Sequence, residues 1–203
     1  MAFTAVGNRR RGIDPSVSRD RVLEAAEDLI LKGAFAPATV TELADLAGVS
    51  RATVFSRFGS KLGVLQELSV RCAGGPEMRA IRDAVALDDP VEAVRAVILA
   101  GCNHWERQGH ILLTLKAVAE LEPGAVVLID EQRDDQRRSM EHIAKNLKRA
   151  GKLNGLKLAD AVAALHLITS VESFMELRRN AGLSLDATKT VLTSMAARLF
   201  NLP

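Results

Sequence analysis

The sequence is poor in aromatic residues and cysteine, and it contains no tyrosine at all. Only 3% of its 203 residues are aromatic, whereas 48% are hydrophobic. An apolar content carried mainly by alanine, leucine and valine favours helices over β-sandwiches, which draw on aromatic and β-branched runs. Two cysteines, Cys72 and Cys102, are too few for a disulfide scaffold and indicate reduced thiols in a cytoplasmic protein.

Long apolar runs are also missing. No stretch of about 18 uncharged apolar residues occurs, so we expect no membrane-spanning helix. The first residues, MAFTAVGNRRRG, lack the apolar segment of a signal peptide. A chain of 203 residues can bury a core in one or two domains.

Signatures of catalysis and metal binding are absent as well. The sequence has no G-x-S-x-G, no glycine-rich phosphate loop and no H-E-x-x-H motif. Cys102, His104 and His110 lie close together, but side chains at i and i+2 of a helix point in different directions. Paired acids such as Asp88 and Asp89 are typical of a solvated linker. We therefore expect a protein that is not an enzyme and that uses no metal or cofactor.

The net charge of +2 does not by itself indicate a nucleic-acid partner. Its distribution is more informative, because residues 1–73 hold ten Lys/Arg and eight Asp/Glu, whereas the remaining 130 residues hold seventeen of each. The whole surplus therefore lies near the N-terminus, where Arg9, Arg10 and Arg11 fall in a glycine-containing stretch. We expect residues 1–16 to form a flexible basic arm, which either lies along DNA or is simply solvated.

Residues 39–58, TVTELADLAGVSRATVFSRF, have the pattern of two short helices joined by a tight turn. Thr39 and Glu42 have the spacing of a capping box at the first helix. Gly48 stands where a helix ends in a left-handed conformation, and Ser50 is a good N-cap for the second helix. Helix, glycine-containing turn, helix is the helix-turn-helix signature, in which the second helix enters the major groove of DNA.

The second helix and its flank are basic. Between Ser50 and Lys61 the chain has three positive charges and no negative one. An ordinary helix pair with a solvated basic edge is the alternative interpretation. The candidate DNA-binding residues are Thr39, Ser50, Arg51, Thr53, Phe55, Ser56, Arg57 and Lys61.

Residues 18–72 resemble the N-terminal domain of the tetracycline-repressor (TetR) family. The resemblance covers about a third of the chain and rests on RVLEAAEDLILKGAF, TVTELADLAGVSRATVFSRFGSK and a fourth helix that opens at Lys61. It implies an all-helical protein that binds DNA as a dimer and usually senses a small molecule with its C-terminal domain. Two positions depart from the family: Phe55 replaces a common tyrosine, and Leu62 replaces a frequent acidic residue. A phenyl ring cannot donate a hydrogen bond to phosphate, so that contact is absent or replaced by packing.

We predict an all-α protein in which a three-helix helix-turn-helix domain precedes a larger helical ligand-binding and dimerisation domain. After the basic arm, the DNA-binding domain should span residues 17–75 and the C-terminal domain residues 76–203. Ser18 should cap the first long helix, which Gly33 should end, and Ser60 should cap the fourth. The periodicity predicts further helices over 77–87, 90–108, 110–121, 123–150, 157–180 and 184–201.

Trp105, the only tryptophan, lies on an apolar stripe and either packs in the core or lines a ligand cavity. The resemblance implies a small apolar or amphipathic ligand. The run DEQRDDQRRS interrupts the stripe of residues 123–150, so either this section is solvated or Arg133, Gln136 or Arg137 faces a cavity. The candidate ligand-binding residues are Asn103, His104, Trp105, Met140, Ser170, Phe174 and Met175.

The last two predicted helices are apolar enough either to pack on their own core or to form half of a four-helix bundle with a second copy. The resemblance favours a homodimer, which would read a palindromic operator in double-stranded DNA. The candidate interface residues are Leu165, Ile168, Leu185, Leu192, Met195 and Leu199.

These features favour a sequence-specific transcriptional regulator, specifically a homodimeric repressor that a small ligand releases from DNA. One alternative is a DNA-binding regulator without an inducer. Another is an all-helical enzyme or carrier, which would need a catalytic or cofactor constellation that the sequence does not display.

Overall fold

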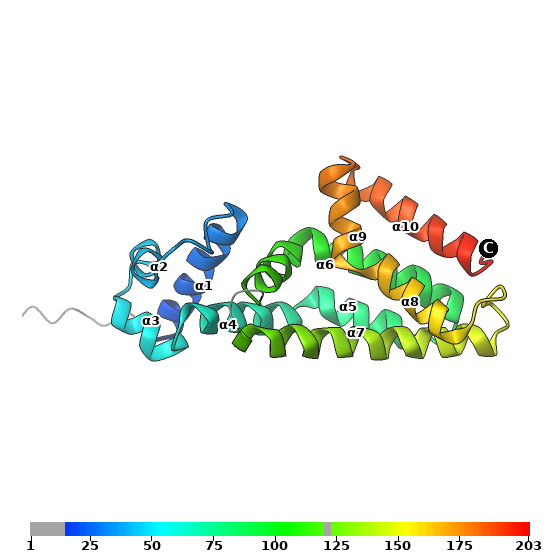
Figure 1. Ribbon diagram of the computed structural model, residues 1–203, viewed down its shortest axis with the longest axis horizontal. Helices are drawn as coiled ribbons and strands as arrows, with labels where there is room; N and C mark the ends of the chain where they lie inside the picture. Colours follow the sequence, from blue (N-terminus) through cyan, green and yellow to red (C-terminus); the bar gives the residue numbers. More distant parts are fainter. Residues whose placement is uncertain (1–14, 120–122) are drawn as a thin grey trace, which may run out of the picture. The chain divides into compact units, whose positions relative to one another are not determined.

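The computed structural model describes residues 15–119 and 123–203, and the regular elements of this part of the chain are helices (Figure 1). The all-α fold class is therefore confirmed. Arg9, Arg10 and Arg11 of the predicted basic arm lie outside the described residues. Within the described part, no single helix is long and apolar enough to cross a bilayer; one helix pair, Leu158–Thr169 with Val171–Asn180, meets both criteria together but is bent by 43°.

The N-terminal unit ends at Val64 and is built on three helices that contact one another: α1 (Pro15–Leu31), α2 (Val40–Ala47) and α3 (Arg51–Phe58). The chain enters α1 before Ser18, so Ser18 is buried inside the helix and is not the cap that the sequence suggested. The buried side chains of this unit include Val22, Leu23, Ala26, Leu29, Phe35, Leu43, Ala44, Val54 and Phe58.

The turn between α2 and α3 has the predicted chemistry. Both halves of the capping box between Thr39 and Glu42 are present. Gly48 is left-handed, with φ 64° and ψ 35°, and its backbone N–H donates to carbonyls of the last turn of α2. The Ser50 side chain accepts a hydrogen bond from the Thr53 N–H and so caps α3. Because each device involves residues only a few positions apart, local sequence is sufficient to specify this turn.

The two compact units divide within α4 (Lys61–Ala73), between Val64 and Leu65, whereas the predicted domains meet between residues 75 and 76. The end of α4 is bonded to the C-terminal unit. The Cys72 thiol donates to Gln108 Oε1 at 3.0 Å, and Arg82 Nη1 donates to the Ala73 carbonyl at 3.4 Å. The fourth helix is therefore the covalent link between the two units, and Ser60 caps its start by accepting from the Gly63 N–H at 3.0 Å.

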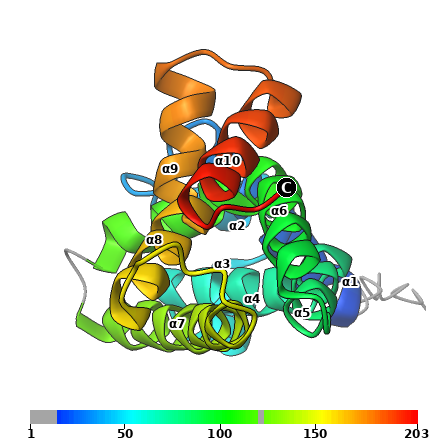
Figure 2. The same ribbon diagram turned by 90° about the vertical axis from the view of Figure 1, so that its right-hand side faces the viewer.

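The C-terminal unit is a helical bundle centred on one long helix, α6 (Pro90–Ala119), which contacts α5 (Pro76–Val85) and all the later α-helices of the unit. Figure 2 looks along this bundle and shows α10 lying over α6 and α8. The later elements are α7 (Pro123–Arg149), α8 (Leu158–Thr169), α9 (Val171–Met175), a π-helical turn (Glu176–Asn180) and α10 (Leu185–Leu199). The core includes Ile98, Cys102, Met140, Ile143, Leu147, Leu165, Phe174 and Phe200.

Residues 90–119 form one helix, whereas the sequence predicted two that meet near Gly109. Gly109 lies inside α6 without interrupting it, although glycine is unfavourable there by about 1 kcal/mol relative to alanine. A Cβ atom at this position would lie 2.5 Å from Met175 Cε and 3.1 Å from Val171 Cγ2. Gly109 therefore permits close packing of α9 on α6, and it does not end a helix.

Residues 157–180, predicted as a single helix, break at Ser170. This residue is extended, with φ −72° and ψ 152°, and its hydroxyl caps α9 by accepting from the Ser173 N–H. The following π-helical turn is held by Arg178, which bonds Glu106 of α6 through two nitrogens at 2.9 and 2.6 Å. Contacts from other helices thus set the path of this segment.

Candidate nucleic-acid interface

Helix α3 presents one basic face to solvent. Val54 and Phe58 are buried and anchor the helix to the N-terminal unit. On the outer side Arg51, Ser56 and Arg57 are exposed, and no acidic residue occurs in the helix. A short helix with an anchored apolar side and an acid-free basic side is suited to lie against a phosphate backbone.

The first turn of α3 holds two hydroxyl groups in fixed positions. The Thr53 N–H donates to Ser50 Oγ at 3.0 Å, and the Ser50 and Thr53 hydroxyl oxygens are 2.8 Å apart. Further along the helix, the Ser56 hydroxyl donates back to the Thr53 carbonyl at 3.1 Å. Serine and threonine hydroxyls can read base edges or phosphates, and these are positioned where a recognition helix makes such contacts.

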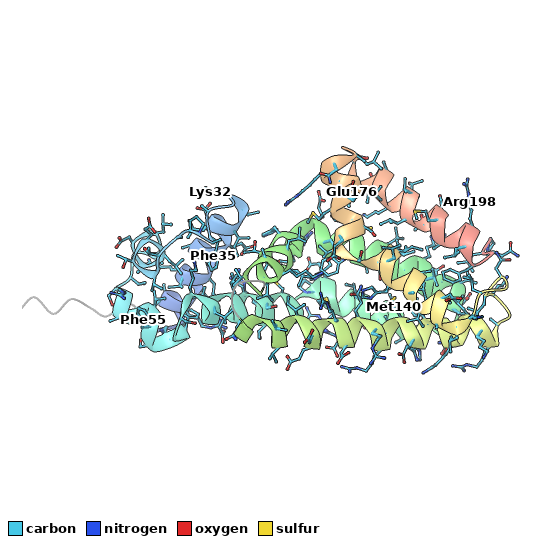
Figure 3. All side chains as sticks on the ribbon, in the orientation of Figure 1. Lys32, Phe35, Phe55, Met140, Glu176 and Arg198 are labelled. Carbon is cyan, nitrogen blue, oxygen red and sulfur yellow. The ribbon has the colours of Figure 1, made fainter. Side chains whose placement is uncertain are left out.

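Arg51 is positioned by Phe55, one helical turn later. Its guanidinium carbon lies 5.1 Å from the centroid of the Phe55 ring, within the range of a cation–π interaction. Phe55 remains 41% exposed and is labelled in Figure 3. Phe55 thus packs against an arginine of the same helix. The sequence analysis missed this pair, although its i, i+4 spacing is a visible signal.

Thr39 is engaged in its own helix cap. Its N–H and its hydroxyl both donate to Glu42 Oε2, at 2.7 and 2.9 Å, and the hydroxyl accepts from the Glu42 N–H at 3.2 Å. These bonds to Thr39 hold the pKa of the Glu42 carboxyl below its usual value. The capping role is confirmed, whereas a DNA contact by Thr39 stays a prediction and would require its single hydroxyl proton to leave a carboxylate.

Lys61 faces the protein. Its ammonium donates to the carbonyl oxygens of Phe35, Ala36 and Ala38 at 3.2, 2.7 and 3.0 Å. It also lies 5.2 Å from the centroid of the Phe35 ring. The sequence analysis selected Lys61 as a candidate DNA-binding residue. In the structure the ammonium instead binds the turn between α1 and α2, where its three protons already have acceptors.

Most of the predicted ligand-binding residues are core residues of the C-terminal unit. His104, Met140, Ser170 and Phe174 are buried, and Trp105 and Met175 are half-buried. Asn103 is exposed, so it does not join them.

Several of these residues meet at the break between α8 and α9. Trp105 Nε1 donates to the Thr169 carbonyl at 2.9 Å, which satisfies an acceptor at the end of α8. Gln136 Nε2 donates to the Thr169 hydroxyl at 3.3 Å. Of the three polar residues suggested to face a cavity, Gln136 points inward, whereas Arg133 and Arg137 are exposed in ion pairs along α7. The polar groups at this break satisfy one another.

His104 is the exception to that satisfaction. It is 6% exposed, and its Nδ1 has no hydrogen-bond partner among the described residues. Burial lowers the pKa of His104 to about 4, while the nearby Glu77 carboxylate acts in the opposite direction. The imidazole is therefore neutral at pH 7. Its ring lies 4.6 Å from that of Trp105, in an edge-on arrangement.

Three of the six predicted interface residues are not on the surface of the protomer. Leu165, Ile168 and Leu192 are buried in the core of their own protomer, so they are not free to contact a second copy. Leu185 and Leu199 are partly buried against that core. Met195 is 48% exposed, and Leu167, which was not selected, is 61% exposed. Periodicity identified apolar faces but could not say which of them the protomer itself covers.

The N-terminal unit also matches a family model. Residues 22–68 match the model described as bacterial regulatory proteins of the tetR family. Residues 22–68 therefore carry the DNA-binding domain of the TetR family. Among the described residues, no group of three or more His, Cys, Asp or Glu side chains is placed to hold a metal ion.

Individual transcriptional regulators are also similar to this chain. A transcriptional regulator of Mycobacterium tuberculosis, AlkX, is 40% identical over 55 residues, which are 27% of this chain and 26% of AlkX. The transcriptional repressor BepR of Brucella suis is 26% identical over 175 residues, which cover 82% of this chain and 83% of BepR. The fold is shared with a transcriptional regulator from Saccharomonospora viridis solved in complex with choline, with a TM-score of 0.70, 18% identity, and coverage of 89% of this chain and 95% of that one.

Proposed function

We propose that this TetR-family regulator is a repressor that binds a palindromic DNA operator as a homodimer and is released from it by a small ligand. The observation that carries the DNA-binding part is α3, whose exposed face is basic, acid-free and capped by hydroxyl groups. A repressor function is supported by the similarity to BepR over most of both chains. We place this activity in the cytoplasm, where the DNA would be met.

Homodimer formation is supported by the surface of the C-terminal helix pair. Leu167 of α8 and Met195 of α10 are large apolar side chains left exposed by the protomer. Ala163 and Val191 stand one turn before them on the same helices. Two such stripes from each copy would form a four-helix interface, which is a common way to cover apolar helix faces.

Release by a ligand is supported by the linking helix and by the relative solved with choline. Since α4 begins in the DNA-binding unit and ends in the C-terminal unit, its backbone connects a ligand site in the C-terminal unit to the DNA-binding unit. A ligand weakens DNA binding only if it binds more tightly to the conformer of the dimer in which the two DNA-binding units are wrongly spaced for the operator.

The proposal is tested with DNA fragments that flank the protein's own gene. In fluorescence anisotropy, the protein should bind one fragment in preference to a scrambled fragment of equal length. Arg51→Ala should reduce that preference, because Arg51 sits on the first turn of α3, where base edges are read. Equal binding of both fragments by the wild-type protein would contradict a sequence-specific regulator.

A further inference from the structure

A cleft of about 730 Å³ lies within the C-terminal unit, where the turn between α5 and α6 faces the last turns of α7. None of the predicted ligand-binding residues lines it. Its apolar surface includes Val85, Leu87 and Pro90. The cleft thus has an apolar surface that a hydrocarbon group can contact.

Two arginines from different helices line the cleft, Arg82 of α5 and Arg149 of α7. Neither forms an ion pair with a carboxylate among the described residues; Arg82 donates to the Ala73 carbonyl and Arg149 to the Asn146 side-chain oxygen. Asp88 also lines the cleft, so its arginine and acidic lining consists of two guanidinium groups and one carboxylate. This balance favours an anion, and guanidinium groups bind carboxylates with matched pairs of N–H donors.

Arg149 is held at the cleft by a row of side chains on α7. The Asn146 side-chain oxygen accepts from Arg149 Nη2, and Asn146 Nδ2 lies 3.2 Å from His142 Nε2. All three residues line the cleft. The bond to Asn146 restrains the long arginine side chain before any ligand arrives, which lowers the entropy cost of binding.

Arg82 connects the cleft to the linking helix. Its Nη1 donates to the carbonyl of Ala73, the last residue of α4, at a long distance of 3.4 Å. A ligand carboxylate is a stronger acceptor than this distant carbonyl. A carboxylate in the cleft would therefore compete for Arg82 and take a hydrogen bond away from the end of α4.

We propose that this cleft binds a small aliphatic carboxylate, with its anionic group on Arg82 and Arg149 and its hydrocarbon on Val85, Leu87 and Pro90. The binding site stands on the cleft itself. Its regulatory consequence, weaker DNA binding through the release of α4 by Arg82, rests on the function proposed above.

Calorimetry on the full-length protein tests the site with three probes of equal chain length: hexanoate, hexanol and hexylamine. Hexanoate should bind, hexanol should bind about tenfold more weakly, and hexylamine should not bind. Arg82→Gln and Arg149→Gln should each weaken hexanoate about tenfold. Arg138→Gln is the matched control, because Arg138 is an exposed arginine of α7 outside the cleft that pairs with Asp135. No heat with hexanoate, equal affinity for hexanol, or an equal loss in Arg138→Gln would overturn the site.

Operator binding tests the regulatory half. Hexanoate should weaken DNA binding by the wild-type protein more than sodium chloride does at the same ionic strength, and Arg82→Gln should abolish that difference. If hexanoate binds but does not change operator affinity, the connection through Arg82 is wrong, whereas the site stands. If calorimetry succeeds and no DNA is bound at all, the proposed function fails and the site still stands.

Discussion

A lysine ammonium has three protons, and all three protons of Lys61 are directed at carbonyl oxygens of the turn between α1 and α2. Those carbonyls follow the end of α1, where backbone acceptors have no partner within a helix. The side chain is half-buried, so water cannot easily replace it. The role of Lys61 is therefore to fix the approach to α2, and a DNA phosphate would have to displace bonds already made.

Lys61→Met should lower the free energy of unfolding by about 1–3 kcal/mol, because three carbonyls lose a charged donor. The slope of DNA affinity against salt should stay the same, since no phosphate contact is lost. Thermal unfolding and salt-dependent anisotropy measure the two effects. Lys32→Met, at an exposed lysine paired with Asp28, is the control. An unchanged Tm together with a salt slope reduced by about one would contradict this structural role and indicate that Lys61 contacts a DNA phosphate.

His104 should make stability depend on pH. Its folded-state pKa of about 4 lies below the ordinary value of 6.5, so the unfolded chain binds the proton more readily. The neutral form contributes its stability above pH 6.5, and that contribution is lost as the pH falls towards 4, by about 3 kcal/mol in total. His104→Gln should flatten this part of a urea-unfolding profile between pH 4 and 6.5. His142→Gln, at an exposed histidine, should leave the wild-type profile unchanged. A flat wild-type profile would show that folding does not lower the pKa of His104.

At the scale of elements, the helices whose ends are set by neighbouring residues could be predicted, and those set by distant residues could not. The capping box at α2, Gly48 and the serine caps all act within four positions along the chain. The break at Ser170 has a local cap, but the neighbouring Thr169 carbonyl accepts from Trp105, and Met175 packs closely on Gly109 of α6, in both cases across more than 60 residues of sequence. Periodicity reports an apolar face but not the partner that covers it.

Helix α3 gives the clearest functional test at this scale. Arg57 is exposed in the last turn of α3 and has no hydrogen-bond or ion-pair partner among the described residues, so its charge is available to a phosphate. Arg57→Ala should weaken binding to specific and scrambled DNA by similar factors and reduce the salt slope by about one. Arg138→Ala, on α7, should change neither quantity. A loss confined to the specific fragment would assign Arg57 to base recognition.

For the whole molecule, the DNA-binding unit was readable from sequence, whereas the candidate ligand site was not. Residues of the helix-turn-helix motif are contiguous, so spacing alone places them. The arginines of the cleft, Arg82 and Arg149, lie on separate helices and each resembles a solvated surface charge in its local context. The residues selected around Trp105 do converge, but they form a packed and mostly hydrogen-bonded core.

The oligomeric state decides whether two DNA-binding units can contact the same operator. A single helix-turn-helix head makes too few contacts to select one site in a genome, whereas a twofold dimer reads half-sites about 34–36 Å apart or a multiple of that distance. Because Leu192 is 3% exposed inside its own protomer, Leu192→Glu should unfold the protein and cannot report on dimerisation. The informative positions are the exposed ones, Leu167 and Met195.

The double variant Leu167→Glu, Met195→Glu should be a folded monomer, because neither change buries a charge in the protomer but both place like charges across the proposed interface. Light scattering should show half the wild-type mass, and circular dichroism should show the same helix content. Affinity for a palindromic operator should fall at least tenfold, while binding to a single half-site stays the same. Val127→Glu, at an exposed valine of α7, should remain dimeric. If the double variant keeps the wild-type mass and operator affinity, the interface lies elsewhere than on α8 and α10.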